Sequence, residues 1–222
     1  MNSIKRQLIV FSCLVLSGLT GLALFMNALH NKSLEINNNW LPSVAHVSRI
    51  NMLTSDFRIN ELEHILSVSE DQMRSYENNM QKTNEAIREE IKSYEPLITT
   101  ENEKRLYPDF VSKWNEYLDQ HKLVITLSKE NRNEDAKAII RGRSDKLFHE
   151  FSSSLTLLAA ENRMLAQQET DAGKQLLILT AINLVLILGL LIYFVYRTAQ
   201  HMKTMFEKLV NRWVSVMTDI YV

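Results

Sequence analysis

The chain has 222 residues, of which 45% are hydrophobic and 23% charged, and its formal net charge is −1. This balance offers no basic surface for nucleic acid, and the single cysteine, Cys13, excludes a disulfide framework. The sequence has no glycine-rich phosphate loop, no G-x-S-x-G motif and no histidine pair at metal-ligand spacing. We therefore expect no enzyme activity, no metal ion and no cofactor.

Two uncharged stretches of 22 residues each lie at residues 8–29 and 175–196. As a helix, each would be about 33 Å long, which is enough to cross a hydrocarbon core of roughly 30 Å. We therefore expect two transmembrane helices. The first stretch follows a short basic segment, as a signal peptide does. It is longer than the apolar part of a signal peptide and has no clear cleavage site, so we favour an uncleaved anchor.

The charges around these stretches predict their orientation. Residues 1–7 and 197–222 carry an excess of Lys and Arg, whereas residues 30–174 carry a net charge of −5. Positively charged flanks stay in the cytoplasm. We therefore expect two cytoplasmic ends and one external domain at residues 30–174, a layout typical of a membrane sensor.

Residues 30–174 are predicted to be all helical, because they contain two glycines and three prolines and no segment alternates with period two. Four helices joined by short turns, with both ends at the membrane, predict an up-down-up-down four-helix bundle. The prolines and capping signals place the helices. The first runs from about Pro42 to about Val68, and the second runs from a Ser69/Gln72 capping box to a point before Pro96. The third runs from a Thr100/Glu103 capping box to about Lys129, and the fourth follows Asn133 and continues through Gln175.

The last three helices each carry one predicted buried stripe. Gly142 interrupts the last helix and is expected to form a short turn after a small leading helix. The predicted stripes are Met73, Tyr76, Met80, Thr83, Ile87, Ile91 and Tyr94, then Leu106, Phe110, Trp114, Tyr117, His121 and Val124, and finally Leu147, Phe151, Leu155, Leu158, Asn162 and Leu165.

The first helix of the bundle has two apolar faces instead of one. Ile50, Leu53 and Phe57 lie on one side of a helical wheel. The other face comprises Met52, Ile59, Leu62 and Leu66. One face is enough for packing in the bundle, so we expect the second face to pack against a twin chain in a homodimer.

Arg58 lies within this wide apolar arc, where an unpaired guanidinium group would be costly to desolvate. It therefore needs an anionic partner, for which Glu61 is the nearest candidate in the chain. The alternative is that Arg58 binds the carboxylate of a small ligand. Asn51, Thr54 and Asn162 are polar residues at predicted buried positions and are candidates for further ligand hydrogen bonds.

Two other polar residues have simpler expected roles. His121 lies on an aromatic stripe and is expected to be a core histidine with a hydrogen-bond partner. Asn183 lies deep in the second apolar stretch, where it is consistent with hydrogen bonding to a partner helix.

Three segments carry a resemblance to a known family. They are N-N-N-W-L-P-S-V-A-H-V-S-R-I-N at residues 37–51, D-F-R-I-N-E-L-E-H-I at 56–65 and N-E-D-A-K-A-I-I-R-G at 133–142. Together with the order of the elements over about residues 1–197, they resemble the four-helix-bundle sensor domain of bacterial methyl-accepting chemotaxis proteins. Similar bundles also occur on histidine kinases and cyclic-dinucleotide enzymes.

The resemblance implies a parallel homodimer in the bacterial inner membrane, with the sensor bundle in the periplasm. It also implies detection of a small anionic ligand, such as an organic acid or an amino acid, directly or through a binding protein. In such receptors a small shift of the last helix passes through the second transmembrane helix. The function expected is therefore that of a chemoreceptor-type sensor; a non-sensing membrane adaptor, or the sensor half of a histidine kinase or cyclase, is the alternative.

The segment at residues 197–222 departs from the family pattern, because it is too short for a HAMP relay and the cytoplasmic signalling hairpin. It carries a stripe with alternating spacings of four and three, which fits a coiled-coil seam or a helix on the membrane surface equally well. We expect either a truncated or frame-disrupted receptor or a short protein that pairs with full-length chemoreceptors or with another kinase. The stripe comprises Met202, Phe206, Leu209, Trp213, Val216 and Ile220.

Overall fold

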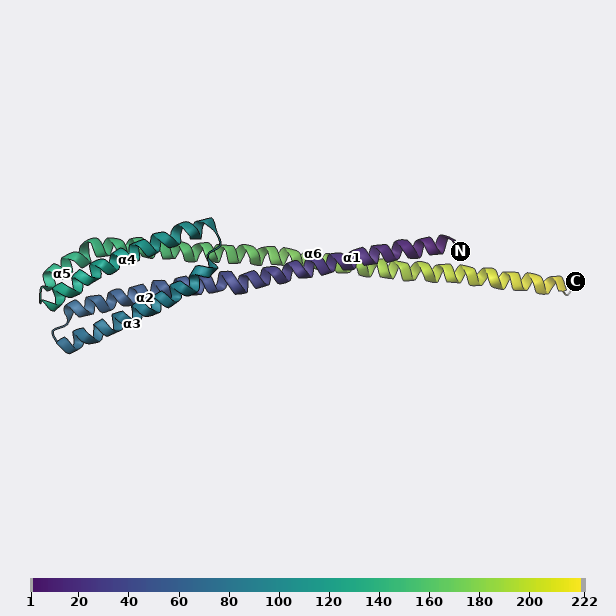
Figure 1. Cartoon of the computed structure of the whole chain (residues 1–222). Coiled ribbons are helices and arrows are strands. Elements are labelled where there is room, and N and C mark those ends of the chain that lie inside the picture. Colours follow the sequence, from purple (N-terminus) through teal and green to yellow (C-terminus); the bar gives the residue numbers. More distant parts are fainter. Residues whose placement is uncertain (1, 221–222) are drawn as a thin grey trace. The chain divides into compact units, whose positions relative to one another are not determined.

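The computed structural model describes residues 2–220, with side chains described for residues 5–217, and every described element is helical. The chain forms two compact units. We call Ser33–Thr170 the bundle unit, and the described residues up to Lys32 and from Asp171 the terminal unit. The elements in order are α1 (Asn2–Glu35), the π-helical turn η1 (Ile36–Trp40), α2 (Leu41–Leu66), α3 (Glu70–Tyr94), the 3₁₀ turn η2 (Glu95–Leu97), α4 (Glu101–Lys129), α5 (Asn133–Ile139), the π-helical turn η3 (Ile140–Ser144) and α6 (Asp145–Ile220) (Figure 1).

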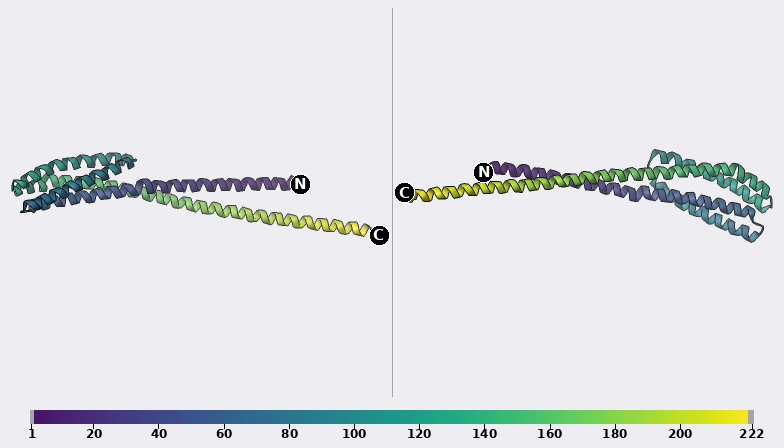
Figure 2. Two further views of the ribbon diagram at one scale, coloured as in Figure 1. Left: turned by 60° about the horizontal axis from the view of Figure 1, so that its bottom comes forward. Right: turned by 180° about the vertical axis from the view of Figure 1, so that it is seen from behind.

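The bundle unit confirms the predicted all-α four-helix bundle. Its four rods are α2, α3, α4 and the line formed by α5, η3 and the first part of α6 (Figure 1). Both views in Figure 2 show α2 and α3 running side by side. Short connections of Ser67–Ser69, η2 with the following residues, and the turn before Asn133 reverse the chain between them, as expected for antiparallel neighbours.

The capping signals were only partly correct. Thr100 accepts a hydrogen bond from the Glu103 amide, and the Glu103 side chain accepts one from the Thr100 amide, so the predicted capping box is present. Ser69 occupies the N-cap position of α3, but its side chain makes no capping hydrogen bond, so the Ser69/Gln72 box is wrong. The acidic side chains of Glu70 and Asp71 in the first turn instead interact favourably with the positive end of the helix dipole and stabilise this end of α3.

Pro42 does not begin a separate helix, contrary to the prediction. Helical structure continues through it, from α1 across the π-helical turn Ile36–Trp40 into α2, and the Leu41 amide bonds to the Ile36 carbonyl. Proline lacks an N–H group and its ring presses on the carbonyl four residues before it. A wider π turn at this point accommodates the proline without ending the helix.

Gly142 breaks the last helix, as predicted. Its backbone dihedrals are φ −102° and ψ −106°, which are not helical, and they lie within the π-helical turn between α5 and α6. The break separates the short helix Asn133–Ile139 from the long helix that begins at Asp145. The residues on the two sides of the turn are consequently free to pack at different angles.

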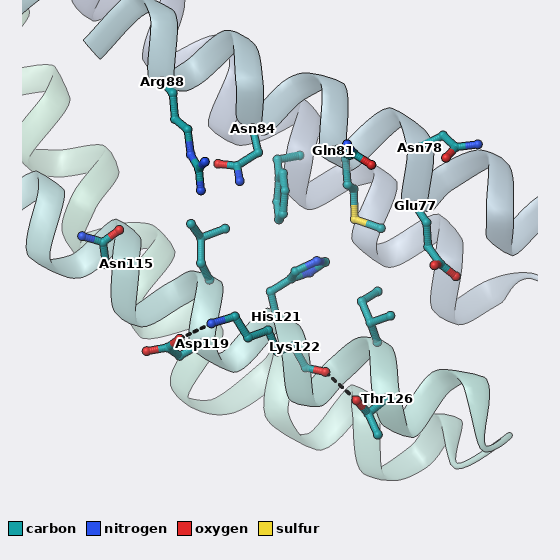
Figure 3. A pocket seen from close by; sticks show the side chains of 14 residues that line it. Glu77, Asn78, Gln81, Asn84, Arg88, Asn115, Asp119, His121, Lys122 and Thr126 are labelled. Carbon is teal, nitrogen blue, oxygen red and sulfur yellow. Dashed lines mark hydrogen bonds and ion pairs between the residues drawn. The ribbon is translucent and has the colours of Figure 1, made fainter. Parts of the chain in front are cut away.

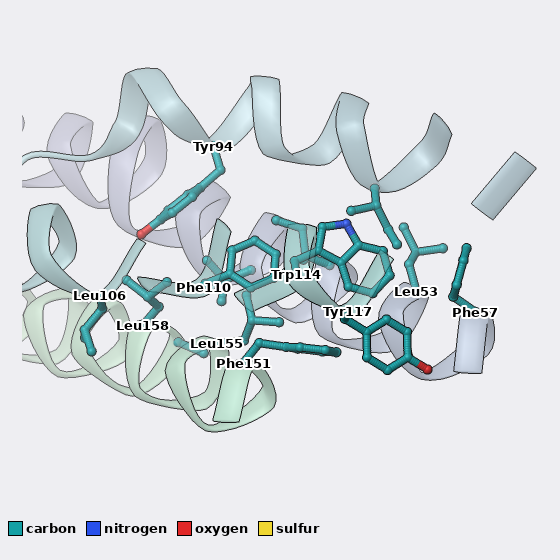
Figure 4. Close-up of a cluster of buried hydrophobic side chains, with 14 of the residues drawn as sticks. Leu53, Phe57, Tyr94, Leu106, Phe110, Trp114, Tyr117, Phe151, Leu155 and Leu158 are labelled. Carbon is teal, nitrogen blue, oxygen red and sulfur yellow. The ribbon is translucent and has the colours of Figure 1, made fainter. Parts of the chain in front are cut away.

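The bundle core combines aliphatic side chains with aromatic rings, which are shown in Figure 4. The rings of Trp114 and Tyr117 are stacked with centroids 5.5 Å apart, and Phe57 meets Trp114 edge-on at 5.3 Å. Each large side chain that is fully buried contributes about 1.5–3 kcal/mol. The predicted stripes are confirmed by these buried members: Met80, Ile87, Tyr94, Leu106, Phe110, Trp114, Tyr117, Val124, Leu147, Phe151, Leu155, Leu158 and Asn162.

The terminal unit contains the two apolar stretches. Two helical runs in the chain, Lys5–Leu66 and Asn133–Met217, contain windows that are long and apolar enough to cross a membrane. Within this unit α1 and α6 approach closely at Gly18, which has no side chain. A Cβ atom added there would lie only 2.8 Å from the Ile187 side chain. The predicted C-terminal stripe is exposed from Met202 to Val216; the side chain of its last member, Ile220, lies outside the described residues.

Asn183 lies on this contact between the two helices. Its amide nitrogen is 3.3 Å from the position of a Cβ atom at Gly21, and its carbonyl oxygen has no hydrogen-bond partner among the described residues. The structure therefore gives Asn183 a neighbour in its own chain. Hydrogen bonding to a second chain stays a prediction.

Candidate functional site

Arg58 is joined to the last rod of the bundle. Its Nη2 atom lies 2.7 Å from Oδ1 of Asp145, and its Nη1 atom donates to the carbonyl of Ser144 at 3.4 Å. The guanidinium group also lies 4.7 Å from the centre of the Phe148 ring. The prediction that Glu61 is the ion-pair partner is therefore wrong. The partner is Asp145, which lies 87 positions after Arg58 in the sequence and directly follows the π-helical turn that contains the break at Gly142.

Glu61 instead belongs to a polar cluster inside the core. Its side chain is completely buried and accepts a hydrogen bond of 2.5 Å from the Tyr117 hydroxyl group. Nδ1 of His121 lies 2.8 Å from its second oxygen, so His121 has the partner expected of a core histidine. Burial and the negative charge of Glu61 raise the pKa of Tyr117, which keeps the phenol protonated as a donor.

A second polar cluster surrounds His64, which is also fully buried. Its Nδ1 atom lies 3.0 Å from the Ser128 hydroxyl group, and its Nε2 atom lies 3.1 Å from Glu77. The other Glu77 oxygen accepts a hydrogen bond of 2.7 Å from Lys129. Burial raises the pKa of Glu77, but the hydrogen bonds from Lys129 and His64 outweigh it and lower the pKa overall. Sequence reasoning missed this cluster.

A third polar cluster contains Asn162, one of the predicted site residues. Its amide nitrogen donates to the Leu158 carbonyl at 3.0 Å and lies 3.5 Å from the Tyr94 hydroxyl group. Tyr94 in turn donates to Glu103 at 3.0 Å. Burial raises the pKa of Glu103, but hydrogen bonds from the backbone amides of Thr100 and Thr99 outweigh it and lower the pKa.

The four predicted site residues do not gather in one place. The Thr54 hydroxyl group donates to the Asn51 carbonyl at 2.9 Å, so it bonds within its own helix. Asn51, Thr54 and Arg58 occupy successive turns of α2. Asn162 lies 17 positions beyond Asp145, the partner of Arg58, which is about 25 Å along α6. The ligand-binding role of these residues stays a prediction.

One face of α2 carries a mostly exposed stripe in which large apolar residues are interspersed with small ones. Its members recur at alternating spacings of four and three residues, which is the heptad pattern of a coiled-coil seam. Ile59 is 55% exposed and Leu66 64% exposed, whereas Phe57 on the bundle face is 2% exposed. We call the following residues the α2 stripe: Leu41, Ala45, Ser48, Met52, Ser55, Ile59, Leu62 and Leu66.

Comparison with known proteins decides the family. The family described as "Four helix bundle sensory module for signal transduction" matches residues 6–177. The chain belongs to this family. It is a sensory signalling family without catalytic activity, which agrees with the lack of an enzyme motif in the sequence.

The module is also similar to a longer protein. YvaQ of Bacillus subtilis (strain 168), which is named as a sensory transducer protein, is 24% identical over 161 residues. The aligned part is 72% of this chain and 28% of YvaQ. The chain thus spans less than a third of the length of that relative.

Proposed function

We propose that this chain is the sensory part of a chemoreceptor-type transducer in the bacterial cytoplasmic membrane. Residues 30–174 face the periplasm and detect a small anionic ligand, such as an organic acid or an amino acid. The observation that carries the proposal is the match to the sensory module over residues 6–177, which includes the bundle and reaches both apolar stretches. The output is control of chemotaxis, with full-length chemoreceptors as partners.

The proposed sensor works as a parallel homodimer joined along the α2 stripe. In one chain the stripe leaves large apolar side chains in water, including Met52, Ile59 and Leu66. Two copies would bury these side chains against each other in the knobs-into-holes manner of a coiled coil. The small members Ala45, Ser48 and Ser55 let the two α2 helices approach closely.

Signal transmission follows from the last helix. It runs from Asp145 to Ile220 as one continuous helix, so a displacement that begins beside the bundle core has a helical path toward the second apolar stretch. A ligand shifts the equilibrium between two packings of the bundle only by the difference in its affinity for them. Residues that contact both the ligand and the core are the ones that set this difference.

Cysteine cross-linking of the full chain in membranes tests the dimer. The single native cysteine, Cys13, is first replaced by alanine, and Ile59→Cys is introduced on the α2 stripe. A disulfide needs Cβ atoms about 4 Å apart. We expect Ile59→Cys to form covalent dimers and Lys82→Cys, on the exposed surface of α3, to remain monomeric. Equal cross-linking of both variants would contradict the stripe as the interface.

Deletion of the gene in its source cells tests the sensory function. We expect the deletion to abolish the chemotactic response to at least one compound in a panel of organic acids and amino acids. Expression of the chain from a plasmid should restore that response. Unchanged responses to the whole panel would contradict a chemosensory role and favour the adaptor.

A further inference from the structure

A groove of about 760 Å³ opens between α3 and α4 within the bundle unit (Figure 3). This volume is in the range of pockets that hold small molecules. Phe57, Met80, Leu118 and Ile125 supply apolar surface to it, and Phe57 and Met80 are buried members of the core. The groove therefore combines an apolar floor with polar walls.

Two polar groups of α3 lie in this groove without a partner. The side-chain oxygen of Asn84 is buried and has no hydrogen-bond partner among the described residues. Arg88 is exposed, and it makes no ion pair or side-chain hydrogen bond with any residue in the part of the chain that the structure describes. Both side chains point toward α4 in Figure 3. A buried oxygen without a donor is costly, so this position favours a ligand that donates a hydrogen bond.

The other charged groups of the groove are already paired. Lys122 lies 2.8 Å from Asp119, and Glu77 is bonded to Lys129 and His64. Arg88 is therefore the cation left to bind an anionic group, and its planar fork suits a carboxylate. The carboxylates of Glu77 and Asp119 disfavour a second negative charge and favour a positive one. Positions 84 and 88 are one turn apart, about 6 Å between Cβ atoms, so one small molecule can reach both.

We propose that this groove is a binding site for an α-amino acid with an apolar side chain. The ligand carboxylate binds Arg88, its ammonium group donates to the Asn84 oxygen, and its side chain packs on Phe57 and Met80. The site lies within one protomer, between α3 and α4, and not on the α2 stripe. The proposal deepens the sensory function above and rests on it.

The floor of the groove connects an occupant to the rest of the bundle. The Phe57 ring of α2 contacts Trp114 at 5.3 Å and His121 at 4.7 Å between centroids, and both of these residues belong to α4. A ligand that packs on Phe57 therefore contacts α2 and α3 at once, close to the rings that join α2 to α4. This is the arrangement by which binding can favour one packing of the helices over another.

Calorimetric titration of the full chain in lipid nanodiscs tests the site. The probes are the twenty proteinogenic L-amino acids, first screened by the thermal shift that each produces at 1 mM. We expect the largest shift from an apolar amino acid. Arg88→Gln should weaken its binding roughly 10- to 100-fold, because it removes a charge-assisted hydrogen bond. Asn84→Ala should weaken binding about 5-fold or more. Lys82→Gln, the same charge change on the opposite side of α3, should leave affinity within about 2-fold.

The outcomes separate this site from the general function. The α-keto acid analogue of the best ligand lacks the ammonium group and should bind at least about 10-fold more weakly. If an amino acid binds but Arg88→Gln does not change its affinity, the groove is refuted while the sensory function stands. If none of the twenty amino acids shifts the unfolding temperature, the amino-acid site is refuted, and the gene deletion with organic acids still decides the sensory function.

Discussion

The buried carboxylate of Glu61 offers the sharpest prediction about stability. It accepts hydrogen bonds from two different helical turns of α4, through Tyr117 at 2.5 Å and His121 at 2.8 Å. Glu61→Ala would leave the Tyr117 hydroxyl group buried without an acceptor, at about 1–3 kcal/mol, and would break a hydrogen bond to His121. Together with the space left by the side chain, we expect a loss of about 3–5 kcal/mol.

The assay is thermal unfolding of the full chain in nanodiscs, followed by circular dichroism in the helical band. For a chain of this size, 1 kcal/mol corresponds to about 2–4 °C, so Glu61→Ala should lower the midpoint by roughly 10 °C. Glu63→Ala is the matched control, because Glu63 is an exposed carboxylate on the same helix. It should change stability by no more than about 0.5 kcal/mol.

A double-mutant cycle then tests the cause. Tyr117→Phe alone removes one donor to a buried carboxylate and should cost about 1.5–3 kcal/mol. In the Glu61→Ala background the same change removes a hydroxyl group that has already lost its acceptor, so it should cost much less. Additive effects of the two substitutions, or a loss below about 1 kcal/mol for Glu61→Ala, would refute the proposed role of this hydrogen bond.

Three further predictions concern other parts of the molecule. Glu103 has a lowered pKa, so its contribution to stability is complete above its ordinary pKa of about 4.3 and is lost as the pH falls through the lower folded-state value. Acid titration of the unfolding midpoint should show this loss, and Glu103→Gln should flatten that part of the curve. Arg58→Ala should destabilise the bundle by only about 1 kcal/mol, because Asp145 is 44% exposed, and a larger change in denaturant unfolding would contradict this. Gly18→Leu should separate α1 from α6, because even a Cβ atom would clash with Ile187; distances between spin labels on the two helices should increase, and unchanged distances would contradict it.

The sequence predicted those features that depend on local chemistry. Stripes of apolar residues at helical spacing identified the rods of the bundle, and a glycine within a helix identified the break at Gly142. The Thr100/Glu103 capping box was also correct, because its residues are three positions apart and form their bonds within one turn. Ser69 shows the limit of this reasoning, since it takes the N-cap position without making the capping bond.

The partner of Arg58 could not be predicted from neighbouring residues. Asp145 lies 87 positions away, and only the packing of α6 after the break brings it to α2. The burial of Glu61 was easier to predict from the sequence. On a helical wheel it lies only about 20° from Ile50, in the middle of the bundle face, which predicts burial more than pairing with a neighbour on the helix surface. The groove depends on how α3 and α4 are spaced, which no local pattern encodes.

The two rods that border the groove are joined by hydrogen bonds at one end of it and beyond the other. At one end, Lys129 of α4 donates a hydrogen bond to Glu77 of α3. Beyond the other end, Tyr94 of α3 donates a hydrogen bond to Glu103 at the start of α4. Seventeen positions separate Glu77 from Tyr94, about 25 Å of helix that can only bow between its two fixed points. Because α3 and α4 are joined at these two positions, the stiffness of the helices limits how far the groove between them can widen. For the ligand proposed above, this would make selection by size a mechanical property of the bundle, in addition to the chemistry of the residues that line the groove.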